Sequence, residues 1–235
     1  MRWKRILFFF HVFLLTFSMT ACGLLRTPAV DPPSETIVIG TLSYGEVSPE
    51  KVQALSLAVD SCVGLEEIGE IDEQMSTIDS GMAYKHPDPR YPNLAVVLRD
   101  GTPVVFQFCN FLGVKPVPAE ELKALCGMTR PDSILKITVS RQREGEKGVE
   151  LSTIENKADL DAFYFCLDDL SPLEGYADSF PVYFFDVELT NGFSFTLDYR
   201  PKQFAVGVND GYYTYGDAMG DWIYSHISQA EDGGR

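Results

Sequence analysis

The sequence predicts an α+β fold, in which antiparallel sheets have helices packed on one face. Apolar and polar residues alternate strictly along residues 193–199, which is typical of a strand with one buried and one solvated face. Turn-forming pairs such as Asp100-Gly101 and Asn191-Gly192 separate apolar runs, as they do in β-hairpins. Helix-starting residues precede segments with helical apolar spacing. These signals favour α+β over a doubly wound parallel sheet.

The first half begins with a β-branched run and a helix-start signal. The predicted elements are a strand at 35–42, a helix from Ser48 to about Gly64, an irregular stretch at 65–92, a hairpin of 94–98 and 104–108, and a short helix at 118–127. Ser48 is expected to cap the first helix, with Pro49 in its first turn. The irregular stretch contains an acidic run and the proline-rich segment 84–92, and long irregular loops are often functional or mobile.

The second half repeats the same kinds of element. The prediction is a strand at 134–139, a returning strand at 149–154, a helix capped by Asn156, hairpins at 181–199 and 203–215, and a last helix capped by Asp217. Each half runs strand, helix ending in cysteine, hairpin and C-terminal helix. This likeness favours two tandem related α+β units, 36–130 and 131–235. The alternatives are a single domain, and a likeness that comes only from shared turn chemistry.

The N-terminus has the composition of an export signal. Three basic residues (Arg2, Lys4 and Arg5) precede a short apolar run at 6–15, and Cys22 follows a segment that is mostly of small or weakly polar residues. The sequence Met19-Thr20-Ala21-Cys22 resembles the lipobox of bacterial lipoproteins, although Met19 stands where leucine is usual. The resemblance covers only residues 1–22.

The lipobox resemblance implies a lipid anchor. Residues 1–21 would be the signal peptide, and Cys22 the acylated first residue of the mature protein, anchored in the bacterial cell membrane and facing outside the cytoplasm. More than one acyl chain is needed for stable anchoring. Residues 22–35 contain three prolines and no apolar period, so they are expected to be a tether to the folded part.

The charge excludes some partners. After the signal, 16 basic and 34 acidic residues remain, which gives a net charge of −18. Nucleic-acid binding requires clustered basic residues, so it is not expected. Anionic lipid surfaces attract basic segments, so the chain is not expected to lie flat on them. An acidic surface also keeps an exported protein soluble.

Four cysteines follow Cys22, namely Cys62, Cys109, Cys126 and Cys166. Disulfides are allowed outside the cytoplasm, and three pairings are open. Small buried apolar residues are the alternative, since all four lie in apolar contexts. A catalytic thiol would need a basic neighbour, and none is near in sequence.

No catalytic, cofactor-binding or metal-binding motif is found in the sequence, so no such residue is predicted. The candidate recognition residues are His86, on a loop that is exposed by composition, and Tyr212, Tyr213 and Tyr215 beside Trp222. The alternative for this aromatic group is a hairpin packed on the last helix.

These features together predict a surface-tethered lipoprotein that is a non-enzymatic binding or accessory module of the cell envelope. Its partners would be the lipid bilayer, through acylated Cys22, and an envelope protein or cell-wall component. The alternative is a small cell-envelope hydrolase that uses dispersed carboxylates or His86.

Overall fold

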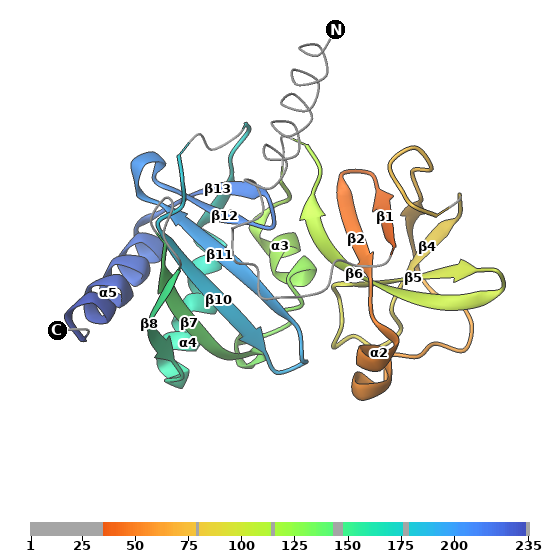
Figure 1. The fold of residues 1–235 in the computed structure, drawn as a ribbon, viewed down its shortest axis with the longest axis horizontal. Coiled ribbons are helices and arrows are strands. Elements are labelled where there is room, and N and C mark those ends of the chain that lie inside the picture. Colours follow the sequence, from red (N-terminus) through yellow and green to blue (C-terminus); the bar gives the residue numbers. More distant parts are fainter. Residues whose placement is uncertain (1–34, 79, 114–115, 143–147, 176–178, 234–235) are drawn as a thin grey trace, which may run out of the picture. The chain divides into compact units, whose positions relative to one another are not determined.

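The computed structural model describes residues 35–78, 80–113, 116–142, 148–175 and 179–233. Residues Pro33–Arg235 form one compact unit. Within the described residues the chain forms two antiparallel sheets, of six and seven strands, together with four α-helices (Figure 1). The predicted antiparallel sheets are therefore confirmed.

The first sheet has the strand order β1-β2-β6-β5-β4-β3. Its strands are β1 (Thr36–Ile39), β2 (Leu42–Glu46), β3 (Glu67–Glu70), β4 (Met82–Lys85), β5 (Leu94–Arg99) and β6 (Thr102–Phe111). The single strand expected at 35–42 is wrong, because Gly40, with φ of +60°, turns the chain and Ile39 pairs with Leu42. The irregular stretch at 65–92 also contains two strands, β3 and β4.

The edge strand β1 is covered by the segment that follows β3. The carbonyl oxygens of Thr36 and Val38 accept from the backbone N–H groups of Thr77 and Asp72, both at 2.9 Å. The N–H groups of the same two strand residues donate to the hydroxyls of Thr77, at 2.8 Å, and Ser76, at 2.9 Å. Side-chain hydroxyls thus stand in for the carbonyls of a neighbouring strand.

Two short helices belong to the first half, α2 (Pro49–Leu55) and α3 (Ala119–Leu125). The hydroxyl of Ser48 accepts from the N–H of Lys51 at 3.3 Å, so the predicted cap is present. The predicted extension of α2 to about residue 64 is wrong. Ser56 adopts a left-handed conformation with φ of 55°, and this lets Leu57 enter the core, where it is fully buried.

The second sheet has the order β8-β7-β10-β11-β12-β13-β9. Its strands are β7 (Ile134–Arg141), β8 (Val149–Ile154), β9 (Leu170–Pro172), β10 (Tyr183–Leu189), β11 (Ser194–Arg200), β12 (Ala205–Val208) and β13 (Gly211–Tyr215). The accompanying helices are α4 (Lys157–Cys166) and α5 (Asp217–Gly233), with the 3-10 turns η1 (Pro131–Ser133), η2 (Leu167–Asp169) and η3 (Pro201–Gln203).

The starts of α4 and α5 are stabilised in different ways. Asn156 caps α4 as predicted, and its side-chain oxygen accepts from the N–H of Ala158 at 2.9 Å. Helix α5 begins at Asp217, but the carboxylate that accepts from the N–H of Ala218, at 3.1 Å, is that of Asp169 in η2. The cap therefore comes from a residue distant in sequence, which local spacing could not reveal.

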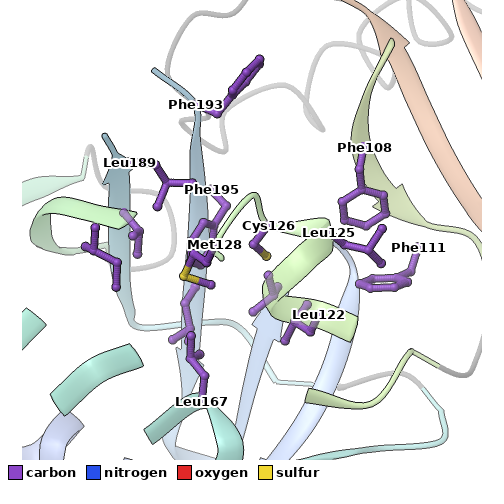
Figure 2. Close-up of a cluster of buried hydrophobic side chains, with 14 of the residues drawn as sticks. Phe108, Phe111, Leu122, Leu125, Cys126, Met128, Leu167, Leu189, Phe193 and Phe195 are labelled. Carbon is purple, nitrogen blue, oxygen red and sulfur yellow. The ribbon is translucent and has the colours of Figure 1, made fainter. Parts of the chain in front are cut away.

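A shared apolar cluster connects the two sheets through α3. Leu122, Leu125 and Cys126 lie between Phe108 and Phe111 of β6 and residues of the second half such as Phe195 and Leu167, as Figure 2 shows. The backbone strengthens this contact, since the N–H of Phe111 donates to the carbonyl of Asn209 in the β12–β13 turn at 2.9 Å.

The turn between β10 and β11 is a second joint between the sheets. The side-chain amide of Asn191 donates to the carbonyls of Arg90, before β5, and Gly127, after α3, both at 3.1 Å. Its oxygen accepts from the N–H of Phe193 at 3.1 Å. The ring of Phe193 in turn lies 6.0 Å from that of Tyr91. One asparagine therefore connects three segments that are far apart in the sequence.

Candidate functional site

The residues predicted for recognition lie in different surroundings. His86 follows β4 of the first sheet, whereas Tyr212, Tyr213 and Tyr215 belong to β13 and Trp222 to α5. Among the four aromatic residues, Tyr213 and Trp222 are buried, and Tyr212 and Tyr215 are half-buried.

The His86 side chain stabilises the loop that contains it through hydrogen bonds with the backbone. Its Nε2 lies 3.0 Å from the carbonyl oxygen of Leu57, and its Nδ1 accepts from the N–H of Asp88 at 3.2 Å. A carbonyl only accepts and a backbone N–H only donates, so the ring carries its hydrogen on Nε2 and is neutral. The ring also contacts Tyr91 edge-on, with centroids 5.6 Å apart. Both nitrogens are engaged within the fold, which disfavours a role as general base.

Tyr213 and Trp222 are core residues. The Trp222 ring lies 4.8 Å from that of Phe163 and stacks on His226 at 4.2 Å, and its Nε1–H donates to the carbonyl of Asp159 at 3.1 Å. The hydroxyl of Tyr213 is buried and has no hydrogen-bond partner among the described residues. Contact of either side chain with a partner would require the core to open.

Tyr212 supports a polar group on the other face of the second sheet. The Arg200 guanidinium lies over its ring at 4.8 Å and pairs with Asp198 at 2.7 Å. Gly207 makes this arrangement fit, since a Cβ there would lie 2.5 Å from the Asp198 carboxylate. Burial and the Asp198 carboxylate raise the pKa of Asp210, while Arg200 opposes the shift.

Tyr215 belongs to a cluster of tyrosine hydroxyls. Its hydroxyl donates to that of Tyr199 in β11 at 3.3 Å, and Tyr199 donates to Tyr224 in α5 at 3.0 Å. The ring of Tyr199 lies 6.0 Å from Tyr215 and 6.1 Å from Tyr224. Tyr199 is buried, whereas Tyr224 is 51% exposed. Three separate elements thus bring their phenol groups together at one place on the rim of the core.

A fourth tyrosine extends this cluster toward an ion pair. Tyr183 at the start of β10 lies opposite Tyr199, with ring centroids 6.4 Å apart. Its hydroxyl donates to the carboxylate of Glu231 in α5 at 2.7 Å, and Arg141 of β7 pairs with the same oxygen at 2.9 Å. We call Tyr183, Tyr199, Tyr215 and Tyr224 the tyrosine cluster.

Three members of the tyrosine cluster, Tyr183, Tyr199 and Tyr215, have a raised pKa in the folded protein. Burial and the hydrogen bonds with its two neighbours raise the pKa of Tyr199. Burial also raises the pKa of Tyr215, and burial with the Glu231 hydrogen bond raises that of Tyr183. Neutral phenols offer hydrogen-bond donors, acceptors and aromatic surface, which suits binding of a polar organic ligand rather than proton transfer.

The four described cysteines, Cys62, Cys109, Cys126 and Cys166, are all free. Cys126 is buried in the cluster of Figure 2, and the other three are half-buried. Burial raises the pKa of each thiol, so none has the environment of a reactive thiolate. In the part of the chain that the structure describes, no group of three or more His, Cys, Asp or Glu residues is arranged to hold a metal.

Sequence reasoning found one member of the tyrosine cluster and missed three. Tyr199 and Tyr183 share the face of the apolar residues at every second position of their strands, so they could only be interpreted as core. Tyr224 follows Ile223 on the last helix, beside the apolar positions. The cross-strand position of Tyr183 and Tyr199 was available in principle, since both flank the same hairpin at matching distances.

The chain matches no family model, and no curated protein or solved structure is detectably similar to it. The predicted signal peptide, the lipobox with Cys22, and all but the last residue of the 22–35 tether lie outside the described residues. None of the described helices combines the length and apolar character that a membrane span needs.

Proposed function

We propose that the protein is a lipoprotein of a bacterial cell envelope, anchored through acylated Cys22, and that its folded part is a non-enzymatic binding module. The lipobox-type sequence at 19–22 supports the anchor, and the proline-containing segment 22–35 supports a tether. An acidic, soluble domain held outside the cytoplasm is suited to contact other envelope components without binding anionic lipid.

The tyrosine cluster is the observation that carries the binding role. Its hydroxyls lie 3.0 and 3.3 Å apart, and Tyr224 exposes about half of its surface on α5. Tyrosines combine apolar contact area with a polar tip and are enriched where proteins recognise partners. The four tyrosines are held by β10, β11, β13 and α5, so their side chains lose little conformational freedom on binding.

The finer architecture belongs to the same proposal. We infer that α4 and α5 cover one face of the second sheet. The ring contacts of Trp222 with Phe163 of α4, at 4.8 Å, and Phe185 of β10, at 5.5 Å, support this arrangement. The tandem relation of the two halves stays a prediction. The order of elements is alike in the two halves, but the pairing of the strands differs. The first hairpin, β1–β2, joins its sheet through its second strand, which pairs with β6. The corresponding hairpin of the second half, β7–β8, joins its sheet through its first strand, which pairs with β10.

The anchor is tested by metabolic labelling. Cells that express either the wild-type chain or the Cys22→Ser variant are fed an alkyne-tagged palmitate, and the tagged protein is then detected in both. We expect labelling and membrane retention of the wild type alone. Equal labelling of both proteins would exclude Cys22 as the acylation site.

The binding role is tested by site-specific photocrosslinking on intact cells. A benzophenone amino acid replaces Tyr224 in the full lipoprotein, and in a matched control it replaces Phe165 of α4, which is 59% exposed. We expect crosslinked material, protein or glycan, at position 224 and not at 165. Equal yields at the two positions, or none, would contradict a recognition role for the tyrosine cluster.

A further inference from the structure

We infer that the tyrosine cluster binds a neutral polysaccharide of the cell envelope, through stacking of a sugar ring on Tyr224 and hydrogen bonds with the clustered hydroxyls. This inference rests on the proposed binding function and adds the chemical class of its ligand. The size, the hydrogen-bonding capacity and the charge of the cluster each support it.

The accessible area of the cluster matches a sugar better than a protein. Tyr224 is its exposed member, Tyr183 and Tyr215 are half-buried, and Tyr199 is buried. A protein partner of ordinary size covers about 800 Å² on each side and needs a broad surface around its central anchors. One half-exposed phenol ring with two half-buried neighbours offers a smaller surface than this, which suits stacking of a single sugar ring.

The hydroxyls leave acceptors for a ligand. Each phenol oxygen has one hydrogen and two lone pairs, so three hydroxyls that bond among themselves still keep unused lone pairs. A polyol presents many O–H donors at close spacing and can satisfy several of these acceptors at once. Tyr199 is buried, so the acceptors within reach of a ligand are the phenol oxygens of Tyr215 and Tyr224.

Charge selects a neutral ligand. Glu231 and Arg141 pair at 2.9 Å beside Tyr183, so the charges at the rim of the cluster compensate each other. The chain that follows the predicted signal has 16 basic and 34 acidic residues, which repels polyanionic polymers at long range. Among envelope polymers, an uncharged glycan strand is the one that this combination of surface and charge accommodates.

The test uses the full lipoprotein, solubilised in detergent, and bacterial cell-wall sacculi stripped of anionic polymers. Bound protein is measured after sedimentation of the sacculi. We expect the wild type to sediment, Tyr224→Phe to bind about threefold to tenfold more weakly through loss of the hydroxyl, and Tyr224→Ala to bind more weakly still. Phe165→Ala is the matched control and should bind like the wild type. The conservative phenylalanine variant keeps the ring and guards against a folding defect.

Competition identifies the part of the wall that is bound. Soluble oligosaccharides of N-acetylglucosamine, which carry neither charge nor stem peptide, should displace the protein from the sacculi. Displacement by the stem peptides alone, or equal binding of the Tyr224 and Phe165 variants, would overturn the glycan assignment. If the sacculi bind nothing while photocrosslinking at 224 captures a protein, the proposed binding function stands and the glycan inference fails. If neither experiment gives a signal, both fail.

Discussion

Asn191→Ala should lower the stability of the fold by more than the loss of one local hydrogen bond would, because this side chain connects three segments of the chain. The substitution removes two bonds donated to the Arg90 and Gly127 carbonyls and one accepted from the Phe193 N–H, all at 3.1 Å. At about 1 kcal/mol for each bond, and less for the solvent-exposed one to Arg90, the loss is about 2–3 kcal/mol. For a domain of this size, that corresponds to about 4–12 °C in melting temperature.

Asn156→Ala is the matched control, since it removes one asparagine bond at the start of α4, with Ala158 at 2.9 Å. A lost cap of this kind costs about 1 kcal/mol, or about 2–4 °C. Thermal unfolding of both variants, followed by circular dichroism at one protein concentration, makes the comparison. A shift for Asn191→Ala no larger than that for Asn156→Ala would refute the reasoning that the β10–β11 turn joins the two sheets.

Three further predictions concern buried polar groups. Burial, with the Glu121 charge second, raises the pKa of Tyr44 to about 12. Since the unfolded phenol titrates near about 10, stability should fall between about pH 10 and 12, and Tyr44→Phe should reduce that fall in urea titrations. The buried ammonium of Lys123 lies 2.6 Å from a carboxylate oxygen of Asp168. Asp168→Asn should lower the unfolding free energy by about 2–3 kcal/mol, because it leaves this ammonium without its carboxylate. Lys123→Met removes the ammonium itself and should lower the unfolding free energy by about 1 kcal/mol or less. Tyr213→Phe should raise the unfolding free energy by about 1 kcal/mol, since it removes a buried hydroxyl that has no partner among the described residues.

Each of these predictions has a result that would contradict it. An alkaline loss of stability as large in Tyr44→Phe as in the wild type would contradict the role of the Tyr44 phenol. Lys85→Met breaks an exposed ion pair with Glu66 and should leave the unfolding free energy nearly unchanged. The argument about the buried ion pair fails if Lys123→Met destabilises the protein more than Asp168→Asn. Tyr91→Phe removes a hydroxyl that donates to a carbonyl, so it should destabilise; a loss of stability in Tyr213→Phe would show that its hydroxyl is satisfied.

Local signals predicted the hairpins and the helix starts well. Asp100 and Gly101 both have positive φ, as the turn between β5 and β6 requires, and Ser48 and Asn156 cap their helices. These features depend on residues close in sequence, so composition and spacing are sufficient. The β12–β13 turn shows the limit of such signals. Its positive-φ residues are Asn209 and Asp210, and not Gly211, which follows them.

Features that depend on distant residues were not predictable. The end of α2 at Leu55 is set by the burial of Leu57 in a core built from both halves, and this competes successfully with a continuous helical spacing. The start of α5 takes its cap from Asp169, and the tyrosine cluster gathers residues from β10, β11, β13 and α5. A single sequence shows the chemistry of these residues but not their convergence.

The covering of β1 has a consequence for the association of two copies of the chain. Proteins anchored by lipid diffuse in two dimensions, where copies collide often and an open strand edge invites exchange between neighbours. Here the outward N–H and C=O groups of Thr36 and Val38 are already bonded to residues 72–77 of the same chain. This edge begins directly after the predicted tether, at the point of the fold nearest in sequence to the proposed anchor. Ser76 and Thr77 therefore occupy the groups through which two copies would form a shared sheet, and the proposed lipid anchor would make encounters between copies frequent.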